Sequence, residues 1–318
     1  MDGIIIVDKP AGWTSHDVVA RVRRILKEKR VGHTGTLDPF ATGVLVLLVG
    51  RATRLAQFLA GAEKEYEATI RLGYATTTGD LTGARREAAD AGGGGADCAA
   101  LDRERFEAAL APLRGEIEQV PPMYSAKKVG GRKLYELARR GEEVERASAR
   151  VNVSVFEVMA DSAGAWSRRN EDGTCDVRAR VVCSAGTYVR ALAESVGERL
   201  GVGAHLAALR RTRAGEFRVE DAFAPDELQK LVGAGAGGGR FLLPPEAALP
   251  RSPSAHLTAE EAHRVRHGAA IRAGREARGW EDGRTVLLLG GGGELLAVGV
   301  YDAAAGLLRP RVMLAGEK

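Results

Sequence analysis

Alternation of apolar and polar positions predicts several strands in the first two thirds of the chain. Apolar runs at residues 3–7 and 43–49 predict two buried strands. Apolar residues occupy every second position from 66 to 72, which is typical of a half-buried strand. The same alternation predicts strands at residues 151–159 and 176–183.

Apolar residues at helical spacing predict helices among these strands. Thr14 and Ser15 can cap the first helix, in which Val18, Val22 and Leu26 repeat along one face. Further helical patterns cover residues 53–60, 102–113, 133–140 and 188–200. Because several adjacent strands have no helix between them, the pattern favours an α+β fold with a mixed sheet over a doubly wound parallel one.

The pattern changes after residue 250, close to two prolines. A helix at residues 258–267 is followed by short strands at 285–289, 295–301 and 307–313. We therefore predict a first domain over residues 1–249 and a small β-barrel-like domain over 250–318.

Two glycine-rich stretches, at residues 83–100 and 233–239, are predicted to be flexible inserts. The second formally fits the dinucleotide-binding motif GxGxxG. Because it follows a helical pattern and not a strand, dinucleotide binding is not expected.

The composition is that of an ordinary globular protein and excludes a collagen, a coiled coil or a wholly disordered chain. The 318 residues carry a net charge of +4, which permits a polyanionic partner without demonstrating one. Of the 46 basic residues, 37 are Arg and 9 are Lys. Arg suits phosphate recognition, but GC-rich codons would produce the same bias, so both explanations stay open.

Cysteine use and hydropathy predict the compartment. Cys98, Cys175 and Cys183 form no CxxC pair, so we expect a reducing compartment, no disulfide framework and no zinc site. The longest apolar run, at residues 44–49, is too short to span a bilayer. The N-terminus lacks the basic start of a signal peptide. A cytoplasmic location without membrane contact is expected.

A glycine-rich loop at residues 32–43 carries the clearest candidate for chemistry. Pro39 favours an extended backbone at Asp38, so the carboxylate can project from the loop. Loops on a rigid scaffold often hold catalytic groups. Asp-Pro also occurs in ordinary turns, where the carboxylate caps backbone amides. From the residues alone, both interpretations remain open.

This loop and five other blocks together resemble the TruB family of tRNA pseudouridine synthases. The blocks occur in the order found in that family and cover residues 3 to about 220, whereas the tail resembles a PUA-type RNA-binding domain more loosely. They are Asp8-Lys9-Pro10-Ala11-Gly12-Trp13-Thr14-Ser15, residues 32–45, Lys64-Glu65-Tyr66, residues 121–135, Cys183-Ser184-Ala185-Gly186-Thr187-Tyr188-Val189-Arg190 and Leu209-Arg210-Arg211-Thr212.

The resemblance implies both a fold and a function. The fold would be a central mixed, largely antiparallel sheet flanked by helices, followed by a PUA-like domain. The function would be isomerisation of uridine 55 in the tRNA T loop to pseudouridine, with a possible accessory tRNA-folding activity. The target base must leave its stack to be turned, so the enzyme must flip it out. No cofactor, metal, guide RNA or protein partner is implied, and a monomer is expected.

The resemblance also assigns roles to particular residues. Asp38 would be the catalytic carboxylate, either attacking covalently or removing a ribose proton, and Arg190 would keep it ionised. Tyr66 would stack on the flipped uracil, a contact worth ~1–3 kcal/mol. Thr77 stands where the family often has Asp, which would weaken the pairing role of that position. Substrate-binding roles are implied for His33, Tyr188, Leu209, Lys9, Arg54 and Arg210.

Clusters of basic residues are candidate RNA contacts, and two alternative functions are open. Residues 21–30, residues 127–140 and the arginines at 210, 211, 213 and 218 are candidate phosphate contacts. A guide-RNA-dependent synthase is one alternative, although the short tail argues against it. A non-catalytic RNA chaperone is the other, and it could coexist with catalysis.

Overall fold

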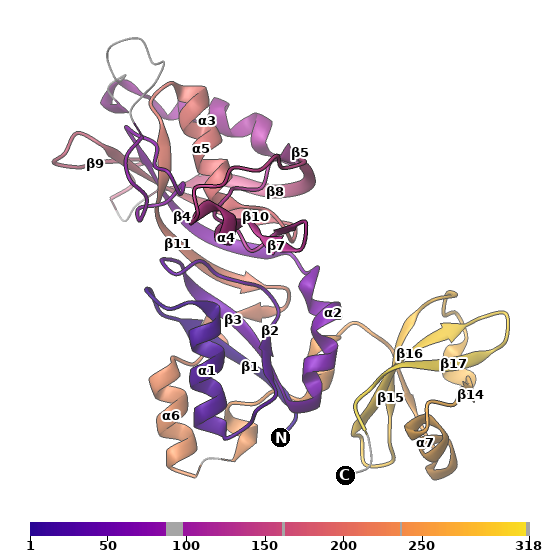
Figure 1. Cartoon of the computed structure of the whole chain (residues 1–318). Coiled ribbons are helices and arrows are strands. Elements are labelled where there is room, and N and C mark those ends of the chain that lie inside the picture. The colour runs from indigo at the N-terminus through magenta and orange to yellow at the C-terminus, as the bar shows by residue number, and fades with distance from the viewer. Residues whose placement is uncertain (87–97, 161–162, 236, 316–318) are drawn as a thin grey trace.

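The computed structural model describes residues 1–86, 98–160, 163–235 and 237–315 (Figure 1). A ten-stranded sheet runs through the main body in the order β1-β3-β11-β4-β10-β8-β5, with β2, β9 and β12 paired at its sides. Its strands are β1 (Gly3–Lys9), β2 (Val31–His33), β3 (Thr42–Val49), β4 (Lys64–Leu72), β5 (Gly115–Gln119), β8 (Ala149–Met159), β9 (Arg168–Arg169), β10 (Cys175–Cys183), β11 (Ala204–Ala214) and β12 (Phe217–Arg218).

Neighbouring strands of this sheet are antiparallel except at one junction. There β11 runs parallel to β3, and the ladder consists of only two pairs, Arg210 with Thr42 and Arg211 with Gly43. By contrast, β11 pairs with β4 along nearly its whole length. The predicted mixed, largely antiparallel sheet is therefore confirmed, and β11 joins its two halves.

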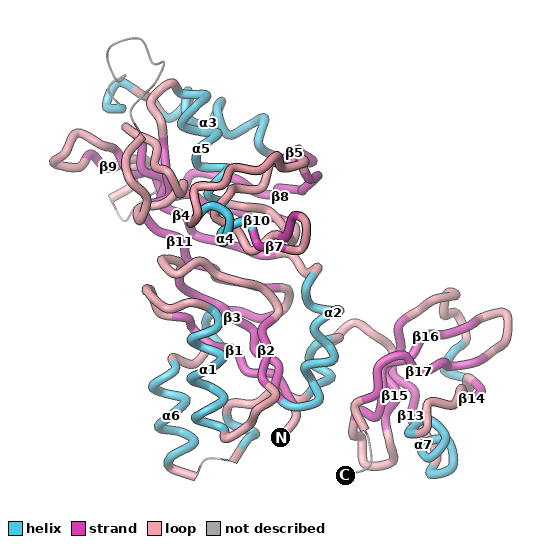
Figure 2. Tube along the Cα trace, viewed as in Figure 1, coloured by secondary structure: helices cyan, strands magenta, loops and turns pink. Residues whose placement is uncertain are grey.

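Helices cover the sheet in two separate places (Figures 1 and 2). In one half, α3 and α5 pack on β4, β8, β10 and β11 around a core that includes Phe106 and Phe156. In the other, α1 and α6 lie side by side on one face of β1 and β3. The helices are α1 (Ser15–Leu26), α2 (Ala56–Ala60), α3 (Arg103–Leu110), α4 (Leu134–Ala138), α5 (Val189–Leu200) and α6 (Pro225–Gly233).

Local sequence accounts for several of these elements. Thr14 caps α1 through a capping box, in which its Oγ1 accepts from the Asp17 N–H at 3.1 Å and its own N–H donates to the Asp17 carboxylate at 2.8 Å. The predicted buried strand at 43–49 is β3, which is buried along almost its whole length. The predicted half-buried strand is β4, in which buried and partly exposed residues alternate.

The C-terminal part contains a second sheet of five strands in the order β13-β15-β16-β17-β14. The predicted strands are present, while β13 and β14 lacked a clear pattern. The elements are β13 (Ser254–His256), α7 (Ala259–Arg266), β14 (Ile271–Arg272), β15 (Thr285–Leu289), β16 (Leu295–Asp302) and β17 (Leu307–Met313). This sheet docks on the main body through a shared apolar cluster that includes Leu55 and Val298.

Three local predictions need correction. The helix expected at residues 53–60 is a 3₁₀-helix, Gly50–Leu55, followed by the short α2. The basic helix expected at 133–140 is only α4, preceded by a small hairpin of β6 (Lys128–Val129) and β7 (Arg132–Lys133). The loop expected from residue 32 begins within β2. Most of the insert at 83–100 lies outside the described residues.

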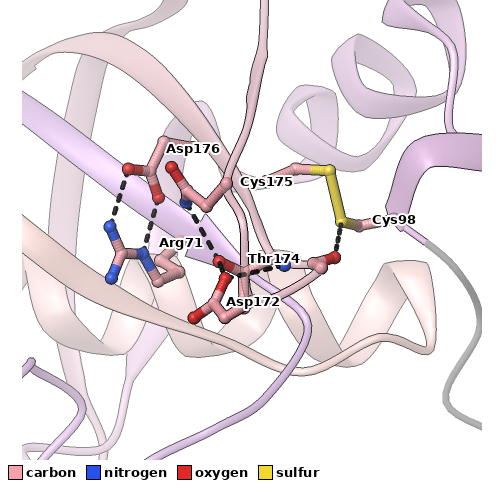
Figure 3. The surroundings of a disulfide bond; sticks show 8 residues. Arg71, Cys98, Asp172, Thr174, Cys175 and Asp176 are labelled. Carbon is pink, nitrogen blue, oxygen red and sulfur yellow. Dashed lines mark hydrogen bonds and ion pairs between the residues drawn. A yellow bond between two sulfur atoms is a disulfide. The ribbon is translucent and has the colours of Figure 1, made fainter.

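The prediction that the cysteines form no disulfide is wrong. Cys98 and Cys175 are disulfide-bonded, with Cα atoms 6.0 Å apart and a sequence separation of 77 (Figure 3). Cys183 is a free, buried cysteine. Because the pair is remote in sequence and matches no motif, spacing alone could not reveal it. The disulfide also removes the basis for inferring a reducing compartment from cysteine use.

Polar side chains near the disulfide form several hydrogen bonds. Arg71 on β4 donates two hydrogen bonds to the Asp176 carboxylate on β10, at 2.7 and 2.8 Å (Figure 3). The Asp172 carboxylate accepts from the N–H and the hydroxyl of Thr174. No helix in the described part of the chain is long and apolar enough to cross a membrane.

Candidate active site

A cleft of about 330 Å³ lies where the two halves of the sheet meet. The loop before β3, the start of β4, the middle of β11, the start of α5 and the segment before β6 contribute to its walls. Five of the nine predicted site residues line it, namely Asp38, Tyr66, Tyr188, Arg190 and Leu209. Residues from five segments far apart in sequence therefore meet in one hollow.

The loop that carries Asp38 is fixed by its neighbours. The Leu37 N–H donates to Ser15 Oγ at 2.9 Å, and the Ser15 hydroxyl lies 3.2 Å from the Leu37 carbonyl oxygen. The Ala41 N–H donates to the Asp38 carbonyl at 3.1 Å and closes a turn. The first turn of α1 thus anchors the loop immediately before its carboxylate.

Lys9, which was predicted to bind substrate, holds this loop instead. Its side chain is fully buried, and its ammonium group donates to the carbonyls of Pro10, Trp13 and Pro39 at 2.9, 2.6 and 3.2 Å. Burial lowers the pKa of Lys9 to about 8, and the Asp38 charge opposes that shift. The contacts place Lys9 behind the Asp38 loop and outside the residues that line the cleft.

Arg211 anchors the same loop from β11. Its side chain is almost fully buried and donates to the carbonyls of Val44, Gly35 and Thr36 at 2.7, 3.0 and 3.4 Å. It also lines the cleft. From the sequence, Arg211 was predicted to be a phosphate contact like its arginine neighbours. Its burial could have been inferred from its position two residues after Leu209, because residues two apart on a strand point to the same face.

Arg190 binds the Asp38 carboxylate directly. Its Nε donates to Asp38 Oδ2 at 2.9 Å, and its other nitrogens donate to the carbonyls of Thr78 and Tyr124 at 2.7 and 2.6 Å. The Asp80 carboxylate lies 3.9 Å from the same Nε. The Arg190 side chain is only 4% exposed, and its guanidinium lies between two acids and two carbonyls.

The balance of charges controls the protonation of Asp38. Burial raises the pKa of Asp38, the Arg190 guanidinium opposes this shift, and the negative charge of Asp80 adds to it. The Asp38 side chain is 35% exposed, in contrast to Arg190, and it faces the cleft as one of its lining residues. The ion pair is thus shielded on the arginine side and accessible on the carboxylate side.

Asp80 is a site residue that sequence reasoning missed. Its carboxylate accepts hydrogen bonds from Thr78 Oγ1 at 2.8 Å, from the Thr82 N–H at 2.9 Å and from Thr82 Oγ1 at 2.6 Å. It is 7% exposed. From the sequence, a weaker pairing role was expected at Thr77. That expectation overlooked Asp80, three residues later, whose carboxylate lies 3.9 Å from Arg190 Nε.

Tyr66, Leu209 and Tyr188 form apolar and aromatic parts of the wall. Tyr66 and Leu209 project from the neighbouring strands β4 and β11 and are 8% and 7% exposed. Burial raises the pKa of the Tyr66 phenol, so it stays neutral at neutral pH, although the Arg211 charge opposes the shift. Tyr188 precedes α5, and its backbone is held by the Gln119 side chain at 2.7 and 3.1 Å.

Three other predicted substrate contacts do not line the cleft. Arg54, in the 3₁₀-helix Gly50–Leu55, donates to the carbonyl of Met313 at the end of β17. Arg210 forms two hydrogen bonds, of 3.0 and 2.7 Å, with the Asp8 carboxylate. His33 stacks edge-on with His16, and burial lowers the pKa of its ring.

The described part of the chain contains no group of three or more His, Cys, Asp or Glu side chains that could hold a metal ion. The groups that meet in the cleft are a paired carboxylate, a neutral phenol, a second tyrosine and an apolar wall. Such a set can hold a planar ring while a carboxylate acts beside it.

Family models and curated relatives agree on one family. Residues 23–189 match the TruB family pseudouridylate synthase N-terminal domain, and residues 190–250 match the tRNA pseudouridylate synthase B C-terminal domain. A tRNA pseudouridine synthase B from Thermobifida fusca is 50% identical over 85% of this chain and 86% of its own length. One from Geobacillus kaustophilus is 44% identical over 86% of this chain and 91% of its own length.

Solved structures show the same architecture. A Cbf5–Nop10–Gar1 complex contains a chain with 27% identity and a TM-score of 0.68, covering 99% of this chain and 85% of that one. An H/ACA ribonucleoprotein bound to a substrate RNA containing 2′-deoxyuridine gives 26% identity and a TM-score of 0.68, covering 98% and 85%. With its motif blocks in family order and its cleft built from them, this chain belongs to the TruB family of pseudouridylate synthases.

Proposed function

We propose that this protein isomerises uridine 55 in the T loop of tRNA to pseudouridine, acting as a monomer without a guide RNA or a cofactor. The observation that carries the proposal is the Asp38–Arg190 ion pair at 2.9 Å, open to a cleft that Tyr66 also lines. The names of the relatives that are 43–50% identical support tRNA as the substrate.

The proposed reaction exchanges one bond for another within the same nucleotide. The bond from N1 to C1′ breaks, the uracil turns, and a bond from C5 to C1′ forms. The proton on C5 is lost and N1 gains a proton, so no oxidant, reductant or external group is needed. Asp38 would act at C1′ or at a ribose proton, and Arg190 would stabilise its charge.

The cleft would also retain the detached base. Tyr66 and Leu209 stand on adjacent strands as apolar walls, and the neutral Tyr66 phenol would assist proton exchange at C5. A closed aromatic pocket limits escape of the free uracil and entry of water. Stacking on the phenol ring would offset part of the cost of flipping the base, by ~1–3 kcal/mol.

The guide-dependent alternative rests on the solved neighbours, which are parts of ribonucleoproteins. Their identity to this chain is 26–27%, whereas the tRNA pseudouridine synthase B relatives reach 43–50% over a comparable share of it. We therefore favour action on free tRNA. The sheet after residue 250 would serve as the RNA-binding domain, and a cytoplasmic location would place the enzyme with its substrate.

The test is incubation with an unmodified tRNA transcript, followed by mapping of pseudouridine. We expect product at position 55 with the wild-type chain and none with Asp38→Asn, while both proteins bind tRNA. Product from Asp38→Asn would contradict the assignment of the carboxylate. Faster tRNA refolding with the inactive variant would support an accessory folding activity, and no acceleration would count against it.

A further inference from the structure

Ser125 has a buried hydroxyl that the protein leaves unused. The residue is 5% exposed, and its Oγ has no hydrogen-bond partner within the described part of the chain. Buried hydroxyls are normally paired, because an unmet one loses its hydration without compensation. A buried hydroxyl without a partner in a folded protein therefore needs an explanation.

The position of Ser125 in the cleft explains why its hydroxyl is unpaired. Five buried side-chain atoms in the described residues lack a partner, and only that of Ser125 belongs to a residue that lines the cleft. The others belong to Arg21, His33, Arg146 and Glu246. The unmet hydroxyl thus coincides with the hollow that holds Asp38.

The backbone around Ser125 is held firmly, so its side chain is positioned in advance. The carbonyl of Tyr124 accepts a hydrogen bond from Arg190 at 2.6 Å. The carbonyl of Ser125 accepts from the Tyr135 N–H at 3.0 Å, at the start of α4. The same arginine that pairs with Asp38 therefore fixes the neighbour of Ser125.

We propose that the Ser125 hydroxyl donates a hydrogen bond to an acceptor oxygen of the flipped nucleotide. A neutral hydroxyl can serve a uracil carbonyl or a ribose or phosphate oxygen, and all three are oxygens that a bound nucleotide brings into the cleft. Binding would satisfy a group that the free enzyme leaves unpaired, which favours the complex. This inference rests on the proposed function.

The first test compares Ser125→Ala with wild type on an unmodified T-stem-loop RNA. We expect kcat/KM to fall about tenfold, the effect of losing one hydrogen bond of about 1.4 kcal/mol. The thermal midpoint should stay the same or rise, because the change removes an unmet buried polar group. Ser154→Ala is the matched control, since that hydroxyl already contacts the Val182 carbonyl at 3.2 Å and lies outside the cleft; its kcat/KM should not change.

A second measurement locates the oxygen. Binding to a stem-loop that lacks the target base should be equal in wild type and Ser125→Ala if the partner is a uracil carbonyl. It should be weaker in Ser125→Ala if the partner is a ribose or phosphate oxygen.

The Ser125 contact and the proposed function can be refuted independently. An unchanged kcat/KM in Ser125→Ala, with wild type active, would overturn the Ser125 contact and leave the proposed function standing; an ordered water would then be the partner. Absence of pseudouridine with wild type in the same assay would overturn the proposed function itself.

Discussion

Reduction of the Cys98–Cys175 disulfide should lower the stability of the main body substantially. The bond closes a loop with a sequence separation of 77 residues. Restriction of the unfolded chain over such a loop contributes about 4.5 kcal/mol at 25 °C in the chain-entropy model. The reduced Cys98 thiol would remain 3.3 Å from the Gly173 carbonyl, to which it can donate, so we expect little further loss in the folded state.

The assay is denaturation by urea, followed through tryptophan fluorescence, with and without reductant. Wild type should lose about 4.5 kcal/mol of unfolding free energy on reduction, whereas Cys98→Ala/Cys175→Ala should not respond to reductant. Pseudouridine formation at moderate temperature should persist, because neither cysteine lines the cleft. Equal wild-type midpoints in both conditions, with the bond verified by mass spectrometry, would refute this reasoning.

Three other predictions concern the site and the fold. Replacing Asp80 by Asn removes a negative charge that raises the pKa of Asp38, so the acid limb of the single-turnover rate should move toward lower pH; an unmoved limb, or one at higher pH, would contradict this. Gly43→Ala should destabilise the protein by about 3 kcal/mol or more in urea denaturation, because its φ is +100° and a Cβ would lie 2.2 Å from a backbone oxygen. The control Gly115→Ala, at φ +78° with open space around it, should cost about 1 kcal/mol; equal losses would discount the steric contact. Removing residues 251–318 should weaken tRNA affinity more than it slows the bound-state reaction, as measured by filter binding and single turnover; unchanged affinity would assign the tail another role.

Local patterns in the sequence were sufficient for the elements whose burial repeats regularly. The alternation in β4 and the capping residues before α1 predicted those elements, because each depends on neighbours within a few positions. The strands β15, β16 and β17 were predicted for the same reason. The short elements β13 and β14 were not, since two or three residues carry no periodicity.

The parts of the site that sequence reasoning missed depend on long-range contacts. Arg211 resembles its exposed neighbours in type, yet its side chain is buried and donates to the carbonyls of Val44 on β3 and Gly35 in the Asp38 loop. Asp80 resembles an ordinary turn residue until the fold brings it within 3.9 Å of Arg190. Cys98 and Cys175 likewise meet only in three dimensions. Residue type identified which groups could do chemistry, whereas burial and pairing decided which of them are available.

The parallel ladder between β11 and β3 is only two residue pairs long, and the cleft lies directly beside it. A sheet is least resistant to bending where the fewest hydrogen bonds cross between strands. We therefore expect this short ladder to act as a hinge, about which the two halves of the sheet tilt without disturbing the strand pairing inside either half. Entry and release of a nucleotide would then require a rotation of one whole half against the other. The rate of product release would therefore respond to substitutions at the ladder even when the reacting groups are unchanged.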